Sequence, residues 1–231
     1  MKVLVYVEGP SDRDGLGAIL RPVIDAGKAK GVGITFHPQG SKDTLLDDVP
    51  RKAADHLAEH PADWVIAAPD LYPMARYSGT RNAHACFEDL DQLLQSRFES
   101  RAAKLGLSVD VRRRFRVHCL KHDLEALLLA ATDQLRQRLK TDDLLKNAWR
   151  KPVEEQNDDR PPKRVIEDLF RKYRKKPDYI DTVDAPWILQ RATLATVEEA
   201  CSQRFAPFVA DLRAAIESAS ESQGTKQPYR R

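Results

Sequence analysis

Short apolar runs and longer amphipathic stretches alternate along the first part of the chain. The opening run at 2–7 (KVLVYV) is continuous and rich in β-branched residues, which is typical of a strand buried on both faces. Similar short runs lie at 32–36 and 64–68, and apolar and polar residues alternate at 109–120. The pattern therefore predicts four short strands.

Apolar residues at helical spacing fill the stretches between these strands. They predict helices at 13–27, 43–59 and 83–104, and a further helix from residue 123 onward. Pro50 is expected to start, kink or split the second of these helices, because its ring does not fit a regular helix interior. Strands that alternate with helices indicate an α/β fold, with a mostly parallel sheet flanked by helices on both faces.

The pattern changes after about residue 140, where helices and loops replace strands. A polar, proline-rich connection leads to Lys163, at which a basic helix is predicted to begin. Two further helices are predicted at about 194–201 and 205–218. This part of the chain is therefore expected to be a helical C-terminal extension of the α/β core.

The length and composition fit a soluble globular protein. With 231 residues, of which 42% are hydrophobic, the chain has room for one domain with a sizeable appendage. We expect an α/β core at 1–140, a helical extension packed on it at 141–218, and a disordered tail at 219–231. No apolar stretch approaches the ~18–20 residues that cross a bilayer. The three cysteines are too few and too far apart for a disulfide framework, so a cytoplasmic protein is expected.

Charge is distributed unevenly along the chain. Residues 1–96 carry 10 Lys/Arg and 14 Asp/Glu, a net of −4, whereas 97–231 carry 28 and 21, a net of +7. Basic residues gather at 97–121, with eight Lys/Arg and two acids, and at 163–176, with seven and two. Such stripes suit contact with the backbone of a nucleic acid, and they also suit the solvated faces of helices.

Acidic residues follow two of the predicted strands. Glu8 ends the first strand, Asp70 follows the strand at 64–68, and Asp12 lies one tight turn beyond Glu8. Ligands of open α/β sheets bind outside the carboxyl ends of the strands, and Mg²⁺ takes oxygen ligands. These carboxylates are therefore candidate metal ligands, although Asp12 also suits a helix cap and Asp70 a turn. Glu8 needs a partner, because an unpaired carboxylate beside a buried strand is costly.

The segment VLVYVEGPSD at 3–12 resembles the first motif of the TOPRIM domain of topoisomerases, primases and OLD-type nucleases. In that domain a glutamate ends the first strand and supports metal-dependent phosphoryl transfer, a role that the resemblance gives to Glu8. The later TOPRIM motif is Asp-x-Asp, whereas this chain has Tyr72 in the place of the second aspartate. The resemblance implies a Rossmann-like TOPRIM core, with a metal site that lacks one of the usual ligands.

Further segments extend the resemblance along the chain. Asp-Leu-Tyr-Pro lies at 70–73, His-Asp-Leu-Glu-Ala-Leu-Leu at 122–128, Asn-Asp-Asp-Arg-Pro-Pro-Lys-Arg at 157–164, and Arg-Phe-Ala-Pro-Phe at 204–208. In this order they resemble the TOPRIM-like family called domain of unknown function 4276, whose members commonly read His-Glu-x-Glu-Ala-Leu and Pro-Ser-Lys-Arg in the second and third segments. The resemblance runs from about residue 3 to residue 214.

The helix predicted from residue 123 adds candidate ligands. His122 and Glu125 are three residues apart and share one face of that helix, and Asp123 lies beside them. Spacing alone favours a simpler role for Asp123 and Glu125, which is to complement the positive helix end. The apolar sequence after Glu125 and the family resemblance together favour metal ligation. His118-Cys119-x-x-His122 has no second Cys/His cluster, so a structural zinc site is not expected and His118 needs only an ordinary hydrogen bond.

Lys163 follows a Pro-Pro turn at the start of the basic helix. OLD-type TOPRIM nucleases use a lysine, so the resemblance makes Lys163 the candidate for stabilising charge on the reacting phosphate. The residue also suits a plain phosphate or solvent contact. The chain has no GxGxxG, GxxxxGK[ST] or GxSxG motif, which disfavours dinucleotide-binding, P-loop and α/β-hydrolase functions.

Together these features predict a nuclease that depends on Mg²⁺ or Mn²⁺ and cleaves the phosphodiesters of DNA or RNA. The predicted catalytic residues are Glu8, His122 and Lys163, and the predicted metal ligands are Glu8, Asp12, Asp70, Asp123 and Glu125. Relatives of the family are frequently encoded beside an AAA- or ABC-type ATPase, so the resemblance implies such a partner and a role in prokaryotic antiphage defence. The alternative, supported by Tyr72, is a catalytically inactive module that senses or docks to the ATPase. Whether the chain forms a homo-oligomer stays open.

Overall fold

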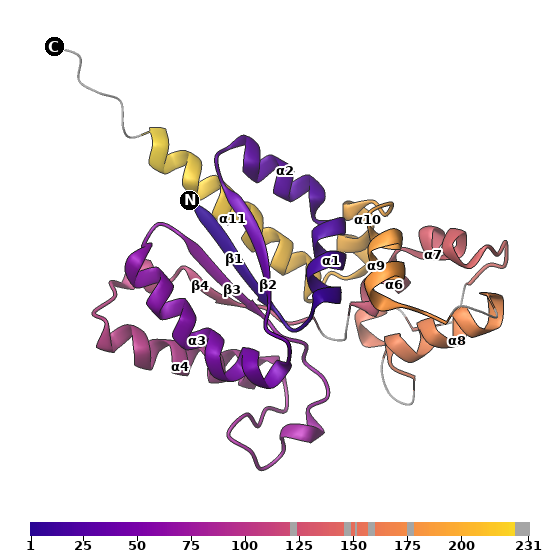
Figure 1. Ribbon diagram of the computed structural model, residues 1–231, viewed down its shortest axis with the longest axis horizontal. Helices are drawn as coiled ribbons and strands as arrows, with labels where there is room; N and C mark the ends of the chain where they lie inside the picture. Colours follow the sequence, from indigo (N-terminus) through magenta and orange to yellow (C-terminus); the bar gives the residue numbers. More distant parts are fainter. Residues whose placement is uncertain (121–123, 146–148, 151, 157–159, 175–177, 225–231) are drawn as a thin grey trace.

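A four-stranded, all-parallel sheet lies at the centre of the molecule (Figure 1). The computed structural model describes residues 1–120, 124–145, 149–150, 152–156, 160–174 and 178–224. The strands are β1 (Lys2–Val7), β2 (Gly33–Pro38), β3 (Trp64–Ala68) and β4 (Phe115–Val117), and their order is β2-β1-β3-β4. The α/β fold predicted from the alternation of strands and helices is therefore confirmed, as is the parallel sheet.

Helices connect the strands and cover both faces of the sheet. Up to β4 they are α1 (Pro10–Ile19), α2 (Arg21–Ala29), α3 (Lys42–Glu59), η1 (Ala75–Tyr77), α4 (Phe87–Lys104) and α5 (Val109–Arg112). After β4 come α6 (Glu125–Ala130), α7 (Thr132–Leu139), η2 (Val153–Glu155), α8 (Pro162–Arg174), α9 (Asp181–Leu189), α10 (Leu194–Ala200) and α11 (Phe205–Gly224). Figure 1 shows α3 and α4 on one side of the sheet and α2 and α11 on the other.

Alternate residues of the central strands enter two separate hydrophobic cores. In β3, Val65 and Ala67 pack with α3 and α4, whereas Ile66 and Ala68 belong to the core that contains α1 and α2. Successive side chains of a strand point to opposite faces, so a strand covered on both sides needs an unbroken apolar run. This requirement explains why β1 and β3 read as continuous rather than alternating apolar sequence.

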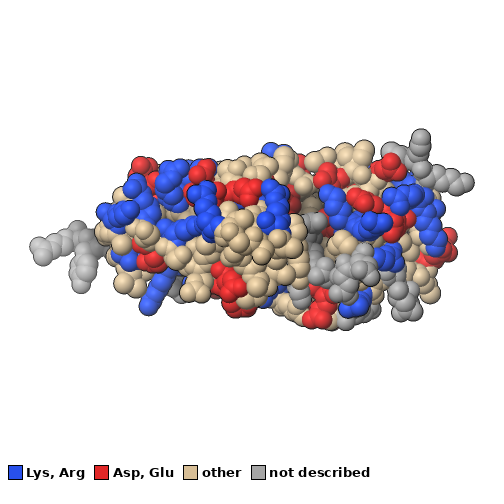
Figure 2. Space-filling model, turned by 90° about the horizontal axis from the view of Figure 1, so that it is seen from below, with Lys and Arg blue, Asp and Glu red and all other residues tan. Residues whose placement is uncertain are grey.

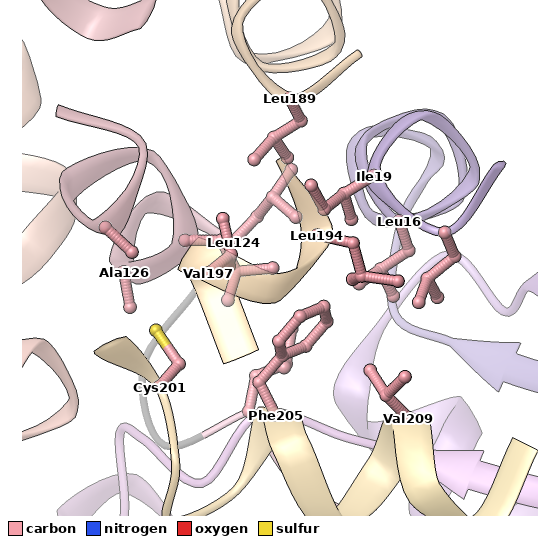
Figure 3. Close-up of a cluster of buried hydrophobic side chains, with 14 of the residues drawn as sticks. Leu16, Ile19, Leu124, Ala126, Leu189, Leu194, Val197, Cys201, Phe205 and Val209 are labelled. Carbon is pink, nitrogen blue, oxygen red and sulfur yellow. The ribbon is translucent and has the colours of Figure 1, made fainter. Parts of the chain in front are cut away.

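The helices after residue 140 share the core that covers the β1 and α1 side of the sheet. Figure 3 shows Leu16 and Ile19 of α1 among side chains of later helices, including Leu189 of α9 and Phe205 of α11. Apolar burial of this kind stabilises the association of the two parts. The predicted domain division at 140 stays a prediction, and the structure adds that one core serves both sides of it.

Several element boundaries differ from the predicted ones for local reasons. The helix predicted at 13–27 is broken after Ile19, and α2 begins at Arg21 with a proline in its first turn, where the missing N–H costs nothing. Pro50 lies inside α3, which it neither starts nor splits. The strand predicted at 109–120 is wrong in its first half, because the hydroxyl of Ser108 caps the short helix α5 and β4 begins only afterwards.

The described residues of the C-terminal part include an α-helix and a short 3-10 helix that the periodicity did not predict, and one helix that is longer than predicted. The new elements are α9, which contains Pro186, and η2. The longer one is α11, which continues past the predicted end at 218 to Gly224, so residues 219–224 of the tail predicted to be disordered are helical. The remainder of that tail, 225–231, lies outside the described residues.

A buried aspartate joins three helices that follow β4. Asp184 on α9 is 2% exposed, and one of its oxygens accepts a hydrogen bond from Nε of Arg138 on α7 at 2.7 Å and lies 2.6 Å from Nη2 of the same guanidinium. The Arg174 guanidinium of α8 lies 3.6 Å from the same oxygen. The other oxygen accepts from the backbone N–H of Ile180 at 2.8 Å. This carboxylate therefore fixes α9 relative to α7 and α8.

Replacing this carboxylate is expected to destabilise the fold. Asp184→Ala leaves two guanidinium groups without their shared partner, at an expected cost of about 3 kcal/mol in the free energy of unfolding. Asp133→Ala on α7 is the matched control, since Asp133 is 80% exposed and 3.9 Å from Arg136, and it should change that energy by less than about 0.5 kcal/mol. Urea denaturation of both variants makes the comparison, and equal midpoints would contradict the structural role of Asp184.

Candidate functional site

The strand order creates one switch point at the carboxyl edge of the sheet. The connection from β1 to β2 runs through α1 and α2 on one face, whereas α3 and α4 cover the other face. The crossover direction therefore reverses between β1 and β3, which lie side by side. Ligands of open α/β sheets bind at such a switch point, outside the carboxyl ends of the strands. Glu8 follows β1 directly, and Asp70 lies two residues beyond the end of β3.

A cleft of about 220 Å³ opens at this switch point. Predicted site residues that are widely separated in the sequence line it together: Glu8, Asp12, Asp70, Glu125 and Lys163. Gly40 and Ser41, which precede α3, and Asp181, at the start of α9, complete much of the wall. His122 and Asp123, the other two predicted site residues, lie outside the described residues.

Glu8 and Asp70 are joined directly across the two strand ends. Glu8 Oε1 accepts a hydrogen bond from the backbone N–H of Asp70 at 3.0 Å, so the partner that Glu8 needs includes this amide. On the other side, the carbonyl oxygen of Glu8 accepts from the N–H of Gly40 at 2.8 Å. Beyond Asp70, the N–H of Leu71 donates to the carbonyl oxygen of Leu120 at 3.0 Å. Both acidic residues are thus held by backbone bonds to neighbouring segments.

Asp12 combines two roles at the start of α1. Its Oδ2 accepts from the backbone N–H of Gly9 at 2.8 Å, which is the contact of a capping box, so the helix-cap alternative is correct for that oxygen. A carboxylate has two oxygens with several acceptor positions. Capping by one oxygen is therefore compatible with a ligand contact by the same side chain, which also lines the cleft.

Glu125 and Lys163 bring opposite charges to the cleft from helices that follow β4. Glu125 is the first residue of α6 and is only 3% exposed, whereas Lys163 lies in the first turn of α8 and is exposed. Burial raises the pKa of the nearby Tyr179 phenol, and the negative charge of Glu125 raises it further. The Tyr179 side chain is thus a neutral neighbour of the Glu125 carboxylate at physiological pH.

Several helices begin at this cleft. Residues of the caps or first turns of α1, α3, α6, α8 and α9 line it: Gly9, Ser41, Leu124, Lys163 and Asp181. Helix N-termini carry partial positive charge, which stabilises nearby carboxylates and attracts phosphate groups. Complementarity to the positive helix ends is therefore one reason why acidic residues occur at Asp12, Glu125 and Asp181. It does not account for Glu8 or Asp70, which follow strands.

Sequence reasoning missed Asp181, because it missed the helix that carries it. Asp181 and Asp184 both lie in the first turn of α9 and precede an apolar stretch, which is the usual pattern of a helix start. The sequence therefore contained the signal for the start of this helix. It did not contain the position of α9 against α1, which brings Asp181 to the cleft, because that position depends on the tertiary core that the two helices share.

The donor set of the cleft suits a hard divalent cation. Its acidic side chains offer carboxylate oxygens, which Mg²⁺ and Mn²⁺ prefer. Within the described ranges, no group of three or more His, Cys, Asp or Glu side chains is arranged closely enough to hold a metal ion. Mg²⁺ commonly takes only one or two protein carboxylates and completes its shell with water and phosphate oxygens. Glu8 and Asp70 together supply two carboxylates, which is the number that such a Mg²⁺ site needs.

Both basic stripes of the sequence include charges that are paired within the protein. At 97–121, Arg101 lies 2.7 Å from Asp55 and Arg112 lies 2.8 Å from Glu99. On α8, Arg171 lies 2.8 Å from Asp168. On the face in Figure 2, Lys and Arg gather on the half that carries α8, at right, and on the opposite half. Among the described residues of the two stripes, the one that lines the cleft is Lys163 of α8. A polyanion bound at the cleft is therefore more readily served by α8.

The region of the rejected zinc motif has ordinary contacts. His118 Nε2 lies 2.9 Å from Asp211 Oδ2, which is the hydrogen bond expected for this residue. Burial raises the pKa of the Cys119 thiol to about 12, so this side chain is protonated at neutral pH.

The fold and the cleft define an α/β protein with an acidic site at the switch point of a parallel sheet. The family model described as Domain of unknown function (DUF4276) matches residues 7–213, so the chain belongs to this family, as its motifs predicted. No curated protein and no solved structure matches the chain. In the part of the chain that the structure describes, no helix has both the length and the apolar character to span a bilayer.

Gly15 provides a test of how the cleft wall is supported. A Cβ at this position would overlap Cδ2 of Leu124, the residue before Glu125. Gly15→Ala is therefore expected to displace the start of α6 and to lower the free energy of unfolding by about 1–3 kcal/mol. Gly17→Ala on the same helix is the control, because its Cβ would meet nothing within 4 Å. It should leave stability unchanged or raise it by up to about 1 kcal/mol. Urea denaturation separates the two, and equal stabilities would contradict the Leu124 contact.

Proposed function

We propose that the chain is a nuclease that depends on Mg²⁺ or Mn²⁺ and hydrolyses the phosphodiesters of a nucleic acid. The observation that carries the proposal is the pairing of Glu8 with Asp70, 62 positions apart, at the carboxyl edge of the sheet. Lys163 lines the same cleft. Carboxylates that can bind a metal ion and an ammonium group that can bind a phosphate therefore lie in one site. The proposal includes a Rossmann-like TOPRIM core, which is supported by the segment at 3–12 and by the parallel sheet.

The roles of the side chains follow from their charges. A bound divalent cation would polarise the scissile phosphate and increase the acidity of an attacking water. Glu8 and Asp70 would hold this cation through carboxylate oxygens, with Asp12 and Glu125 as further ligands from the same cleft. Lys163 would stabilise the negative charge that grows on the phosphate oxygens in the transition state. The proton relay in this proposal is Glu8 or His122, of which His122 lies outside the described residues.

The wider setting of the proposal rests on the family resemblance. We extend it to an effector of prokaryotic antiphage defence that works with an AAA- or ABC-type ATPase encoded nearby. The family is described as one of unknown function. The support for this setting is that its relatives are frequently encoded beside such an ATPase. Co-purification of the chain with the product of a neighbouring ATPase gene tests this part separately from the chemistry.

A second candidate function is a binding or regulatory module that retains the fold without catalysis. Two observations favour it: Tyr72 stands where the related motif has a second aspartate, and no three-residue metal group was found among the described residues. Such a module binds nucleic acid or the ATPase without metal-dependent cleavage.

Substitution of the carboxylates of Glu8 and Asp70 distinguishes the two candidate functions. Purified protein is incubated with plasmid, single-stranded DNA and tRNA, in Mg²⁺, Mn²⁺ or EDTA. We expect metal-dependent cleavage that falls at least about 100-fold in Glu8→Gln and in Asp70→Asn, because each removes a ligand charge. Asp25→Asn is the control, since Asp25 lies exposed on α2 and should not affect the rate.

The outcomes of this experiment are separable. Cleavage that survives Glu8→Gln at the wild-type rate contradicts the assignment of the site. Absence of cleavage in any metal, together with binding of nucleic acid in EDTA, supports the second candidate function.

Lys163 is expected to contribute one phosphate contact. Each neutralised phosphate adds about 0.9 to the slope of log affinity against log salt concentration for duplex DNA. Lys163→Gln should therefore reduce this slope by about 1, measured by fluorescence anisotropy in EDTA so that no cleavage occurs. Lys28→Gln on the exposed side of α2 is the control. An unchanged slope in Lys163→Gln would show that this lysine does not contact the nucleic-acid backbone.

A further inference from the structure

Lys42, the first residue of α3, has a buried side chain next to the cleft. It is 6% exposed, and its Nζ donates to the carbonyl oxygen of Leu71 at 2.9 Å and lies 3.5 Å from that of Tyr72. A cation at a helix N-terminus opposes the helix dipole, and burial of a charge is costly. The acceptors around Lys42 must therefore offset both costs, which makes this a specific arrangement rather than an incidental surface lysine.

His84 completes the arrangement from the loop that follows β3. Its Nδ1 lies 2.7 Å from the carbonyl oxygen of Asn82, and its Nε2 lies 3.1 Å from the carbonyl oxygen of Leu71, the same oxygen that accepts from Lys42. Nε2 also lies 3.3 Å from Nζ of Lys42. The same ammonium lies 5.0 Å from the centre of the Tyr77 ring, within the range of a cation–π contact. Leu71, Tyr77 and His84, all in the loop after Asp70, thus contact the ammonium group of Lys42.

The contacts of Lys42 join two walls of the cleft. Gly40 and Ser41, directly before Lys42, line the cleft on the side of β2, and Asp70 lines it on the side of β3. Leu71, whose carbonyl oxygen binds Lys42, is the residue after Asp70. The direction in which the Asp70 carboxylate points depends on the path of this segment, which lies beyond the end of β3 and forms an isolated bridge from Asp70 to Leu120. The bond of Lys42 to the carbonyl oxygen of Leu71 holds the same segment from the side of α3.

We propose that Lys42 is a positioning residue for the Asp70 carboxylate, an inference that rests on the proposed metal-dependent function. Groups that orient metal ligands without touching the metal commonly change metal affinity by about 10–100-fold when they are removed. Lys42 also contributes positive charge near the acidic cleft, and that charge alone would weaken the binding of a cation. Positioning and simple charge therefore predict changes of opposite sign.

Calorimetric titration of the full chain with Mn²⁺ alone tests this sign. We expect Lys42→Met to weaken Mn²⁺ binding by about 10-fold or more, because the Leu71 carbonyl oxygen loses the shorter of its contacts with Lys42 and His84. Lys42→Arg, which keeps charge and donors, should recover part of the affinity. Lys104→Met, an exposed lysine at the far end of α4, is the control and should bind Mn²⁺ as the wild type does. Circular dichroism confirms that each variant is folded.

The outcomes separate this inference from the function on which it rests. Mn²⁺ binding that is unchanged or tighter in folded Lys42→Met overturns the positioning role and leaves the proposed function standing. A wild-type chain that binds no Mn²⁺ overturns both. Should Lys42→Met fail to fold, Lys42→Gln takes its place, because it also removes the ammonium that donates to the carbonyl oxygen of Leu71. Unchanged Mn²⁺ affinity in folded Lys42→Gln then overturns the inference.

Discussion

The parallel pairing of β1 with β3 is the constraint on which the site depends. Val7 lies opposite Ala68 in the register of these strands, so Glu8 and Asp70 leave the sheet at the same edge. The hydrogen bond from the Asp70 amide to the Glu8 carboxylate closes this edge. The strand order makes it the switch point of the sheet, where helices on both faces begin. The segments that carry Asp12, Glu125, Lys163 and Asp181 all reach the cleft at this edge.

The acids of the cleft differ from other buried acids of the protein in their placement. Asp184 is paired with the guanidinium of Arg138, and Glu154 accepts from three successive backbone amides at the start of α11, those of residues 203–205. Each of these two carboxylates joins elements of the fold. At the cleft, acids from separate elements line one open space beside several helix N-termini. The proposed metal-dependent function uses this convergence of acids on one space.

Much of the fold and the centre of the site could be predicted from sequence, because both depend on local rules. Runs buried on both faces revealed β1 and β3, and the strand-end rule then selected Glu8 and Asp70. The short β4 was overestimated, because the Ser108 cap diverts the chain into α5. Asp181 was missed, because the packing of α9 depends on contacts far away in the sequence. Lys42 was missed for a similar reason: only the folded loop after Asp70 distinguishes it from an ordinary surface lysine.

The central claim is that the carboxylates at the switch point hold a divalent cation, and crystals of the wild-type chain soaked in Mn²⁺ test it most directly. Anomalous scattering from manganese locates the ion without any assumption about activity. The account predicts a peak in the cleft, at about 2.0–2.2 Å from an oxygen of Glu8 or Asp70, the coordination distance typical of small divalent cations. Manganese bound only outside the cleft, or no peak at all in saturating Mn²⁺, would contradict it.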